Sequence, residues 1–550
     1  MKKYENRTFK IIWDGYPKQC GYIVGIYLLS MAVLFPFYAS DRYFHILRDR
    51  TRFFIIATII MATSVLFVTF YYSIQYLRER YNEGLRPLPG IEEFKQYLHR
   101  KAAAMQPADG FFLLFLVTCS VSTLSSGYAK ECFLGTQGRY QGLLIWLLYG
   151  AAYFIVRKFL CLEKGTYSLF LCSGFLLSIW GITDYIGLDI FGWLAIIQEG
   201  QRGTFTSAFG NINTYTAGMS IFLSLYGIGF IHSISCTEKG NVFQTVFYAV
   251  AFVFAGISMI TGQSDNAVIG IAAFFFILPF VAWRTKHGFF GSLFLFSLFL
   301  LSFMITAALN AYFVNPYIDS FGGILLQVSN NITKKPAFLA MYLLFILFST
   351  CGLVNCRRKS KLPGWNGQIP QSRIVLSTWG IILALGIFSV IFFLCDANLW
   401  HPGRYESYNK YLVFNDSWGT NRGMCWRIAI EEYLKFPLWK KLIGSGLETF
   451  GIVVNNTRCQ EMVAICGQTF DSPHNEPLQY LFTTGVVGAV SYYSFLAYGC
   501  IKGFLSCNGI KEAAASAVVV YTAVSLVNIS VPITQPYIIL LTAVILARPD

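Results

Sequence analysis

Residues 421–479 are the longest polar passage in this sequence, and they hold side chains that could do chemistry. The passage begins NRGMCWRIAIEEYLKFPLWKKLIGSGLETFG and, after a loop, ends DSPHNEPLQ. Cationic, acidic and imidazole groups gather in it just before another apolar run: Arg422, Arg427, Glu431, Glu432, Lys440, Lys441, Arg458, Asp471, His474 and Glu476. Arginine and lysine bind anions, while histidine and glutamate transfer protons. If the protein is an enzyme, we expect much of its chemistry here.

Arg427 has two interpretations at this stage. The segment from Trp426 to Lys435 predicts an amphipathic helix. Its apolar side would carry Trp426, Ile430, Tyr433 and Leu434. Arg427, Glu431 and Lys435 would line another side at i, i+4 spacing, which is also typical of a surface ion-pair ladder. Arg427 is therefore either a functional cation or a member of such a ladder.

His474 precedes a predicted helix start. Pro477 suits the first turn of a helix, which would place His474 at the N-terminus of that helix. Free backbone N–H groups at such an end favour anions. Glu476 is an alternative proton acceptor, although an acidic residue in the first turn is also common helix capping.

The composition indicates a membrane protein. Of the 550 residues, 55% are hydrophobic and only 13% are charged, and the mean hydropathy is +0.53. A soluble domain carries about 25% charged residues. We therefore predict an all-α, polytopic membrane protein. The net charge of +14 is explained by Lys and Arg residues that flank the spans, without nucleic-acid binding.

Fourteen apolar runs are long enough to cross a membrane, with twelve as the lower limit where runs are short or adjacent. They lie near 20–39, 53–72, 111–127, 141–156, 166–183, 214–232, 243–261, 267–283, 289–308, 337–355, 374–395, 478–500, 513–530 and 533–547. With the N-terminus inside, the inside segments hold 25 Lys and Arg residues and the outside segments hold 17, eight of them in one long loop. Long loops obey the charge rule poorly, so the short loops predict that both termini lie inside. The first run reads as an uncleaved span.

Three regions follow from this topology: a bundle over 1–395 with a cytoplasmic insertion at 73–108, a large external catalytic loop over 396–477, and C-terminal spans over 478–550. In the insertion, IEEFKQYLHRKAAAM predicts a helix on the membrane surface, because Ile91, Phe94, Tyr97 and Leu98 share one face. The external segment 184–213 carries Arg202, and Asn213 or Thr214 could cap the helix after it.

The sequence gives no sign of a metal site or cofactor. It has no CxxC motif, no Cys/His cluster with zinc spacing, and no DxD or clustered carboxylates on the predicted external side. Most of the 14 cysteines fall in or beside apolar runs. Cys459 and Cys466 share the long loop and could form a disulfide in an oxidising compartment.

Three blocks resemble the bacterial O-antigen ligase and polymerase superfamily. GTNRGMCWRIAIEEYLKFPLWKKLIGSGLETFG resembles the family's "R-x-x-x-W, helix, P-x-x-G-x-G-x-x-x-F" block, and DSPHNEPLQYLFTTGVVG resembles its "HN-x-x-L-Q, then G-x-x-G" block. Upstream, RGTFTSAFGNINTYTAG is similar to its "R, then F-G-N-x-N, then A" block. The blocks occur in the family order. One departure is Ser264-Asp265, where the family often has Ser-Arg, and Pro477 is also unusual; both leave the acceptor in doubt.

The resemblance implies a GT-C-like enzyme of the bacterial cytoplasmic membrane. Such enzymes transfer a glycan from an undecaprenyl-diphosphate carrier on the external face, here by an inverting reaction without a bound metal. The acceptor would be a glycan or another lipid-linked unit, so polymerase and ligase both stay open. A lipid-linked oligosaccharide flippase is the competing class, but it should place charged residues within its spans.

The same resemblance gives the polar residues their roles. Arg202 and Arg427, with Arg422 third, would neutralise the leaving diphosphate, because guanidinium meets phosphate oxygens bidentately. His474 or Glu476 would take the proton of the acceptor hydroxyl. Further substrate contacts or supporting positions are assigned to Asp471, Gln479, Lys440, Lys441, Asn211, Asn213 and Asn475. We expect Arg202, Arg427 and His474 to converge on one external cavity.

Overall fold

The computed structural model describes residues 8–82, 84, 95, 105–136, 138–160, 164–235, 241–313, 323–362, 367–369, 372–405 and 412–547. The helices are α1 (Thr8–Val33), α2 (Ile46–Asn82), α4 (Pro107–Leu124), α5 (Ala129–Leu134), α6 (Leu143–Phe159), α7 (Lys164–Tyr185), α8 (Ile212–Ser235), α9 (Val242–Thr261), α10 (Asn266–Ala282), α11 (Lys286–Tyr312), α12 (Ile324–Ile332), α13 (Pro336–Lys359), α14 (Ser372–Cys395), α16 (Trp418–Lys435), α17 (Leu438–Ile443), α18 (Phe450–Cys466), α19 (Glu476–Leu505), α20 (Gly509–Ser525) and α21 (Gln535–Leu546). Short 3₁₀ turns include η3 (Glu199–Thr204) and η4 (Ser207–Phe209), and Asp396–Trp400 forms one π-helical turn. The strands β1 (Phe205–Thr206) and β2 (Gly210–Asn211) pair antiparallel.

The protein is an all-α, polytopic membrane protein, as predicted. Each of the fourteen apolar runs lies on a helix. Ten helices in the described part of the chain are long and apolar enough to cross a membrane, and α10 and α21 are shorter apolar helices. Two further runs, 141–156 and 513–530, correspond to the 17-residue helices α6 and α20. The direction in which the chain crosses the membrane stays a prediction.

Helix α8 lies in the middle of the bundle. All its residues from Thr214 to Ile231 are buried, which is the pattern of a helix surrounded by other helices. It packs against α20, α9, α10 and α11. By contrast, α14 has no buried residue. Most of the apolar surface of α14 is therefore open to lipid. The packed position of α8 fixes the polar residues of its first turn, such as Asn213.

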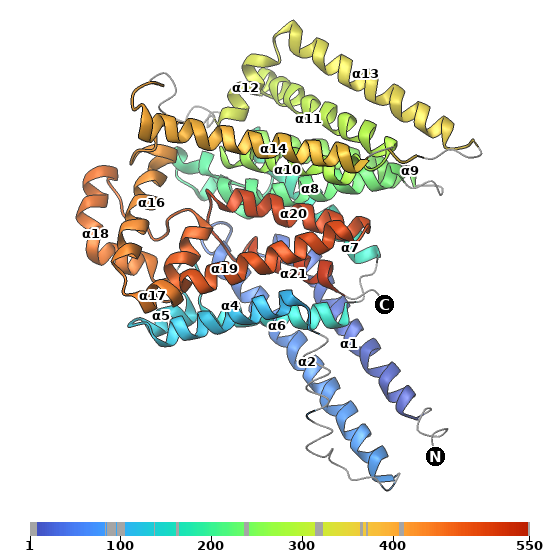
Figure 1. Ribbon diagram of the computed structural model, residues 1–550, viewed down its shortest axis with the longest axis vertical. Helices are drawn as coiled ribbons and strands as arrows, with labels where there is room; N and C mark the ends of the chain where they lie inside the picture. Colours follow the sequence, from blue (N-terminus) through green and yellow to red (C-terminus); the bar gives the residue numbers. More distant parts are fainter. Residues whose placement is uncertain are drawn as a thin grey trace.

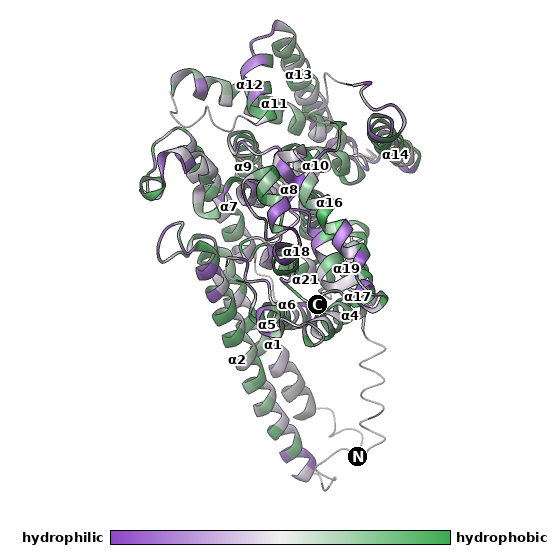
Figure 2. Cartoon of the chain, turned by 90° about the vertical axis from the view of Figure 1, so that its left-hand side faces the viewer, coloured by the Kyte–Doolittle hydropathy of each residue, from purple (hydrophilic) through white to green (hydrophobic). Residues whose placement is uncertain are grey.

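Helices α16, α17 and α18 lie together at one end of the bundle, on the left in Figure 1. Figure 2 looks on to this end, where α16 and α18 carry hydrophilic segments. The region predicted as one large loop is thus largely helical, and α16 confirms the predicted helix. The predicted apolar side is wrong: Ile430 and Leu434 are exposed, and Met424, Ile428 and Ala429 form the buried side. The region of α16, α17 and α18 has a small hydrophobic core, to which α19 adds Phe482. The other core residues are Met424, Ile428, Ala429, Phe450, Val454 and Met462. We call this region the α16–α18 cap.

Some predictions have other outcomes. The proposed disulfide between Cys459 and Cys466 is wrong: both are free and lie seven residues apart on α18, about 10 Å along the helix, which exceeds disulfide reach. The surface helix predicted within the 73–108 insertion falls, apart from Lys95 and Met105, outside the described residues.

A backbone contact joins the cap to α19. The N–H groups of Ser445 and Gly446 donate to the carbonyls of Phe482 and Thr483 at 3.1 Å each. At this contact α19 is kinked at Gly485, whose backbone has φ 66° and ψ −174°. That conformation is essentially restricted to glycine, and a Cβ on Gly485 would also collide with the backbone of Leu442. The two glycine-containing family blocks therefore pack directly on each other.

We expect Gly485→Ala to lower the free energy of unfolding by about 3 kcal/mol, because it combines backbone strain with a collision. Thermal unfolding in detergent measures the change. Gly380→Ala is the matched control, since no atom lies within 4 Å of the added Cβ on α14. Equal melting temperatures for the two variants would show that the kink does not depend on glycine.

Candidate functional site

His474 lies immediately before the first turn of α19. Asn475 caps this helix by accepting a hydrogen bond from the N–H of Leu478 at 2.8 Å, and Pro477 occupies the first turn as predicted. The backbone of His474 has a positive φ of 51°, and its N–H donates to Ser472 Oγ at 3.2 Å. The half-buried imidazole also has the Phe470 ring beside it. A strained backbone that is held by a helix N-cap residue, here Asn475, and by a turn is typical of a functional position.

The charges of two arginines and one aspartate affect the pKa of His474. Burial lowers the pKa of His474 to about 4, and the positive charges of Arg139 and Arg422 add to this shift while Asp471 opposes it. The imidazole is therefore neutral near pH 7 and can accept a proton. Arg139 was not among the residues singled out from the sequence.

Arg422 comes from the start of α16, beside a turn in which Thr420 and Asn421 have positive φ. Its Nε donates to the carbonyl of Val527 at 3.1 Å, and its Nη1 donates to the carbonyl of Gly419 at 2.7 Å. Burial lowers the pKa of Arg422 from its usual value of 12.5, although Asp265 opposes the shift. These hydrogen bonds go to uncharged groups, so its positive charge can still attract an anion.

Asn213 connects the upstream block to the same region. Its Oδ1 accepts hydrogen bonds from Ser264 Oγ at 2.6 Å and Asn266 Nδ2 at 3.3 Å, and its carbonyl accepts one from Asn528 Nδ2 at 3.2 Å. Asn528 follows Val527, the partner of Arg422. Ser264, which precedes the unusual Asp265, is therefore a hydrogen-bond partner of the upstream block. Asn211 accepts from the N–H of Asn213 and shapes this helix start.

Arg427 belongs to an ion-pair network within the α16–α18 cap. It makes a two-point contact with Asp416 at 2.8 Å and contacts Glu431 at 3.2 Å and Glu461 at 2.8 Å. The hydrogen bonds that Arg427 donates to Asp416 are the main reason that the pKa of Arg427 is raised. The network continues through the ion pairs of Arg458 with Glu431, Glu432 and Glu461 and of Lys435 with Glu432. The carboxylates thus offset the charge of Arg427.

The contacts described for the other predicted cations are local ones. Arg202, in η3, donates to the carbonyls of Ile197 at 3.0 Å and Ala195 at 3.5 Å. Lys440 and Lys441 are half-buried on α17, and Lys440 Nζ lies 5.3 Å from the ring centroid of Trp439. No hydrogen bond or ion pair described for these residues links them to His474. In the described structure, the cations that act on His474 are Arg139 and Arg422.

Glu476 is buried inside α19, 2% exposed, and its Oε2 has no hydrogen-bond partner in the described part of the protein. Tyrosines of α19, Tyr480 and Tyr492, are its neighbours. Glu476 does not line the pocket next to Asp471, whereas the predicted residues Asp471 and Gln479 do.

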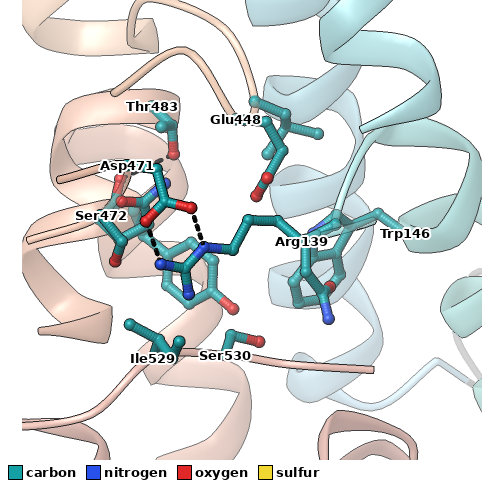
Figure 3. A pocket seen from close by; sticks show the side chains of 12 residues that line it. Arg139, Trp146, Glu448, Asp471, Ser472, Thr483, Ile529 and Ser530 are labelled. Atoms are coloured by element: carbon teal, nitrogen blue, oxygen red, sulfur yellow. Dashed lines mark hydrogen bonds and ion pairs between the residues drawn. The ribbon is translucent and has the colours of Figure 1, made fainter. Parts of the chain in front are cut away.

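This pocket contains two charged residues that the sequence did not single out, Arg139 and Glu448. Arg139 reaches from the loop between α5 and α6 and binds both carboxylate oxygens of Asp471, as Figure 3 shows. Although burial opposes the shift, this contact lowers the pKa of Asp471. Burial raises the pKa of Glu448 to about 7, and Glu448 Oε2 accepts a hydrogen bond from Thr136 at 2.8 Å. The sequence offered one signal for each residue: Arg139 lies in a loop interrupted by glycines, KECFLGTQGRYQG, and Glu448 closely follows the glycines Gly444 and Gly446.

A double-mutant cycle tests whether the Arg427 network is structural. We expect Arg427→Gln and Asp416→Asn each to lower the unfolding free energy and the double variant to lose about 0.5–1 kcal/mol less than their sum, because these half-exposed charges stabilise each other. Thermal unfolding at low and high salt measures this coupling, which salt should weaken. Additive losses would contradict the ion-pair assignment.

One comparison with known proteins finds a match. Residues 336–493 match the family model described as O-Antigen ligase. The matched range runs from the start of α13 into α19 and contains Arg422, Glu448, Asp471 and His474. No curated protein and no solved structure matches the chain. Residues 336–493 of this membrane protein thus form an O-antigen ligase domain, which supports the resemblance of its sequence to the O-antigen ligase and polymerase superfamily.

Proposed function

We propose that this protein transfers a glycan from an undecaprenyl-diphosphate donor to an acceptor hydroxyl on the external face of the bacterial cytoplasmic membrane. The observation that carries the proposal is the position of a neutral His474, next to Arg422 and Arg139, inside the O-antigen ligase domain. The acceptor is another lipid-linked unit if the enzyme is a polymerase and a different molecule if it is a ligase. The family match favours an enzyme over a flippase.

Arg422 is the best candidate for binding the donor diphosphate. Its described hydrogen bonds use neutral carbonyls and a hydroxyl, whereas Arg427 is bound by three carboxylates. A diphosphate would have to compete with those carboxylates at Arg427. The dipole of α19 also favours an anion beside His474, although Pro477 has no N–H and the N–H of Leu478 is bound to Asn475. Cationic groups near the leaving oxygen commonly supply the largest catalytic contribution.

His474 would act as the general base. The acceptor oxygen forms a bond to the anomeric carbon as the bond from that carbon to the diphosphate oxygen breaks, and the hydroxyl proton passes to the imidazole. Attack from the face opposite the leaving group inverts the anomeric centre. The electron pair of the broken bond leaves with the diphosphate, whose added negative charge Arg422 neutralises. No step requires a metal ion.

Reconstituted protein should transfer a synthetic undecaprenyl-diphosphate-linked repeat unit to the lipid-linked or free glycan acceptor. We expect His474→Ala and Arg422→Ala each to lower the transfer rate at least about 100-fold, the usual range for a proton-transfer group and for a charge-stabilising donor. His45→Ala is the matched histidine control because His45 is exposed before α2. Full activity in a folded His474→Ala protein would remove this mechanism.

The pH dependence of kcat/KM tests the electrostatics of His474. Because protonation inactivates a base whose pKa is lowered to about 4, activity should persist below pH 6.5 and fall only near pH 4. Arg422→Gln removes a cation that opposes protonation, so the acidic limb should move up toward 6.5. Arg422→Lys keeps the charge and should leave the limb in place while lowering the rate. Identical limbs in the wild type and both variants would argue against His474 as the titrating group.

A further inference from the structure

The pocket beside His474 is built from four separate segments of the chain. A narrow pocket, partly open to solvent, lies between them; its cavity volume is about 20 Å³, which is room for a hydroxyl group and not for a whole sugar ring. The loop after α5 and the start of α6 supply Arg139, Gln141 and Trp146, and residues 447–448 supply Leu447 and Glu448. The other lining residues are Asp471, Ser472, Gln479, Tyr480, Thr483, Ile529 and Ser530. Figure 3 shows the Arg139 side chain extending between Asp471 and Glu448.

Two amides in this pocket are incompletely hydrogen-bonded. Gln141 is 5% exposed, and neither polar atom of its side chain makes a hydrogen bond of normal geometry in the described structure, although the Tyr149 hydroxyl lies near enough to interact. Oε1 of Gln479 is likewise buried and unpaired among the described residues. A buried polar group left unpaired costs about 1–3 kcal/mol, so such groups call for an explanation. A ligand with hydroxyl groups would supply both donors and acceptors to these amides.

The charges of the pocket disfavour a phosphate. Asp471 already binds the single guanidinium of Arg139, and Glu448, whose pKa is raised to about 7, adds negative charge in part of the molecules near pH 7. Arg422 does not line the pocket, although its partner Val527 is close in sequence to the lining residues Ile529 and Ser530. The pocket and the proposed diphosphate site are therefore neighbours with opposite electrostatic character.

The remaining features suit a neutral sugar. Carboxylate, guanidinium and amide groups can together accept from and donate to neighbouring hydroxyls, and Trp146 and Tyr480 add aromatic surface. Two of the turns involved are strained: Glu448 has φ 60°, and Tyr140, next to Arg139, has φ 56°. Strain of this kind persists where the surrounding structure holds a residue in place for a function.

We propose that this pocket receives a hydroxyl group of a neutral sugar residue of the acceptor and that Glu448 is a specificity-determining contact for that hydroxyl. The inference rests on the proposed function and adds a separate acceptor subsite to it. Arg139 holds Asp471 in position and donates to the same sugar, while the amides of Gln141 and Gln479 complete the contacts. His474, next to Asp471 in the loop before α19, then lies between the acceptor subsite and the diphosphate site.

Glu448→Gln tests this subsite in the reconstituted protein. Removing the carboxylate charge while keeping the shape should raise the KM for the acceptor at least about 10-fold, with the KM for the donor and the slow transfer of the donor glycan to water changed less than about twofold. Glu131→Gln is the matched control on α5, where the side chain is exposed. A raised donor KM with an unchanged acceptor KM would overturn the assignment to the acceptor.

Gln479→Met separates a ligand contact from a structural role. Since Oε1 of Gln479 is unpaired in the protein, its loss should leave the melting temperature unchanged or higher, while the acceptor KM rises. A lower melting temperature together with an unchanged acceptor KM would contradict the proposal.

Direct binding distinguishes failure of this inference from failure of the proposed function. We would titrate the protein with the carrier-free repeat-unit oligosaccharide and, separately, with inorganic pyrophosphate. Glu448→Gln should weaken binding of the oligosaccharide and leave binding of pyrophosphate unchanged. If the wild type binds the oligosaccharide in this way but transfers nothing, the proposed reaction fails and the subsite stands. If the variant binds the oligosaccharide normally and pyrophosphate more tightly, the pocket is a phosphate site and the inference is wrong.

Discussion

The contact between the Gly444–Gly446 turn and the kink at Gly485 determines how the functional groups of this protein are placed. A Cβ at Gly444 would meet the carbonyl of Thr483, just as one at Gly485 would meet Leu442, so neither chain could come this close with a side chain present. Glu448 follows the turn directly, and His474 lies just before α19, a few helical turns ahead of the kink at Gly485. Because the contact is made by backbone atoms, it fixes both residues relative to each other without using their side chains. Ser122 of α4 also donates to the Thr483 carbonyl, which ties the contact to the membrane bundle.

The arginines of the α16–α18 cap differ in how far nearby carboxylates compensate their charge. Arg427 and Arg458 are bound by Asp416, Glu431, Glu432 and Glu461, and together these groups hold α16 against α18. Such half-exposed pairs contribute modestly to stability, but as a network they fix the orientation of α16. That orientation carries Arg422 to the Val527 carbonyl, where its charge is less compensated. A structural role for one arginine thus supports a functional role for its neighbour five residues earlier.

The sequence was most informative where a pattern repeats along one helix. Hydropathy alone located every membrane helix among the fourteen predicted runs, and Pro477 marked the start of α19. The spacing of Arg427 and Glu431 fitted both a functional cation and an ion-pair ladder, and only the positions of Asp416 and Glu461, distant in sequence, show the ladder extended into a network. Arg139 and Glu448 could not be paired with Asp471 in advance, because their meeting depends on how α5, the Gly444–Gly446 turn and the loop before α19 pack. The same limitation applies to Cys459 and Cys466: their shared helix, which the sequence did not predict, keeps them apart.

A histidine with a pKa near 4 is a weak base, and this property has a consequence for the proposed reaction. Burial is the largest cause of the lowered pKa, and Arg422, where the diphosphate would bind, is one of the two cations that add to it: a bound anion offsets the charge of Arg422, which makes protonation of the imidazole less unfavourable. Donor binding would therefore raise the basicity of His474. In the absence of donor the weak base would not deprotonate the acceptor, and with the donor in place it would be better matched to neutral pH. The order of events would then follow from electrostatics alone, without a moving lid: the hydroxyl becomes nucleophilic when a leaving group is present to be displaced.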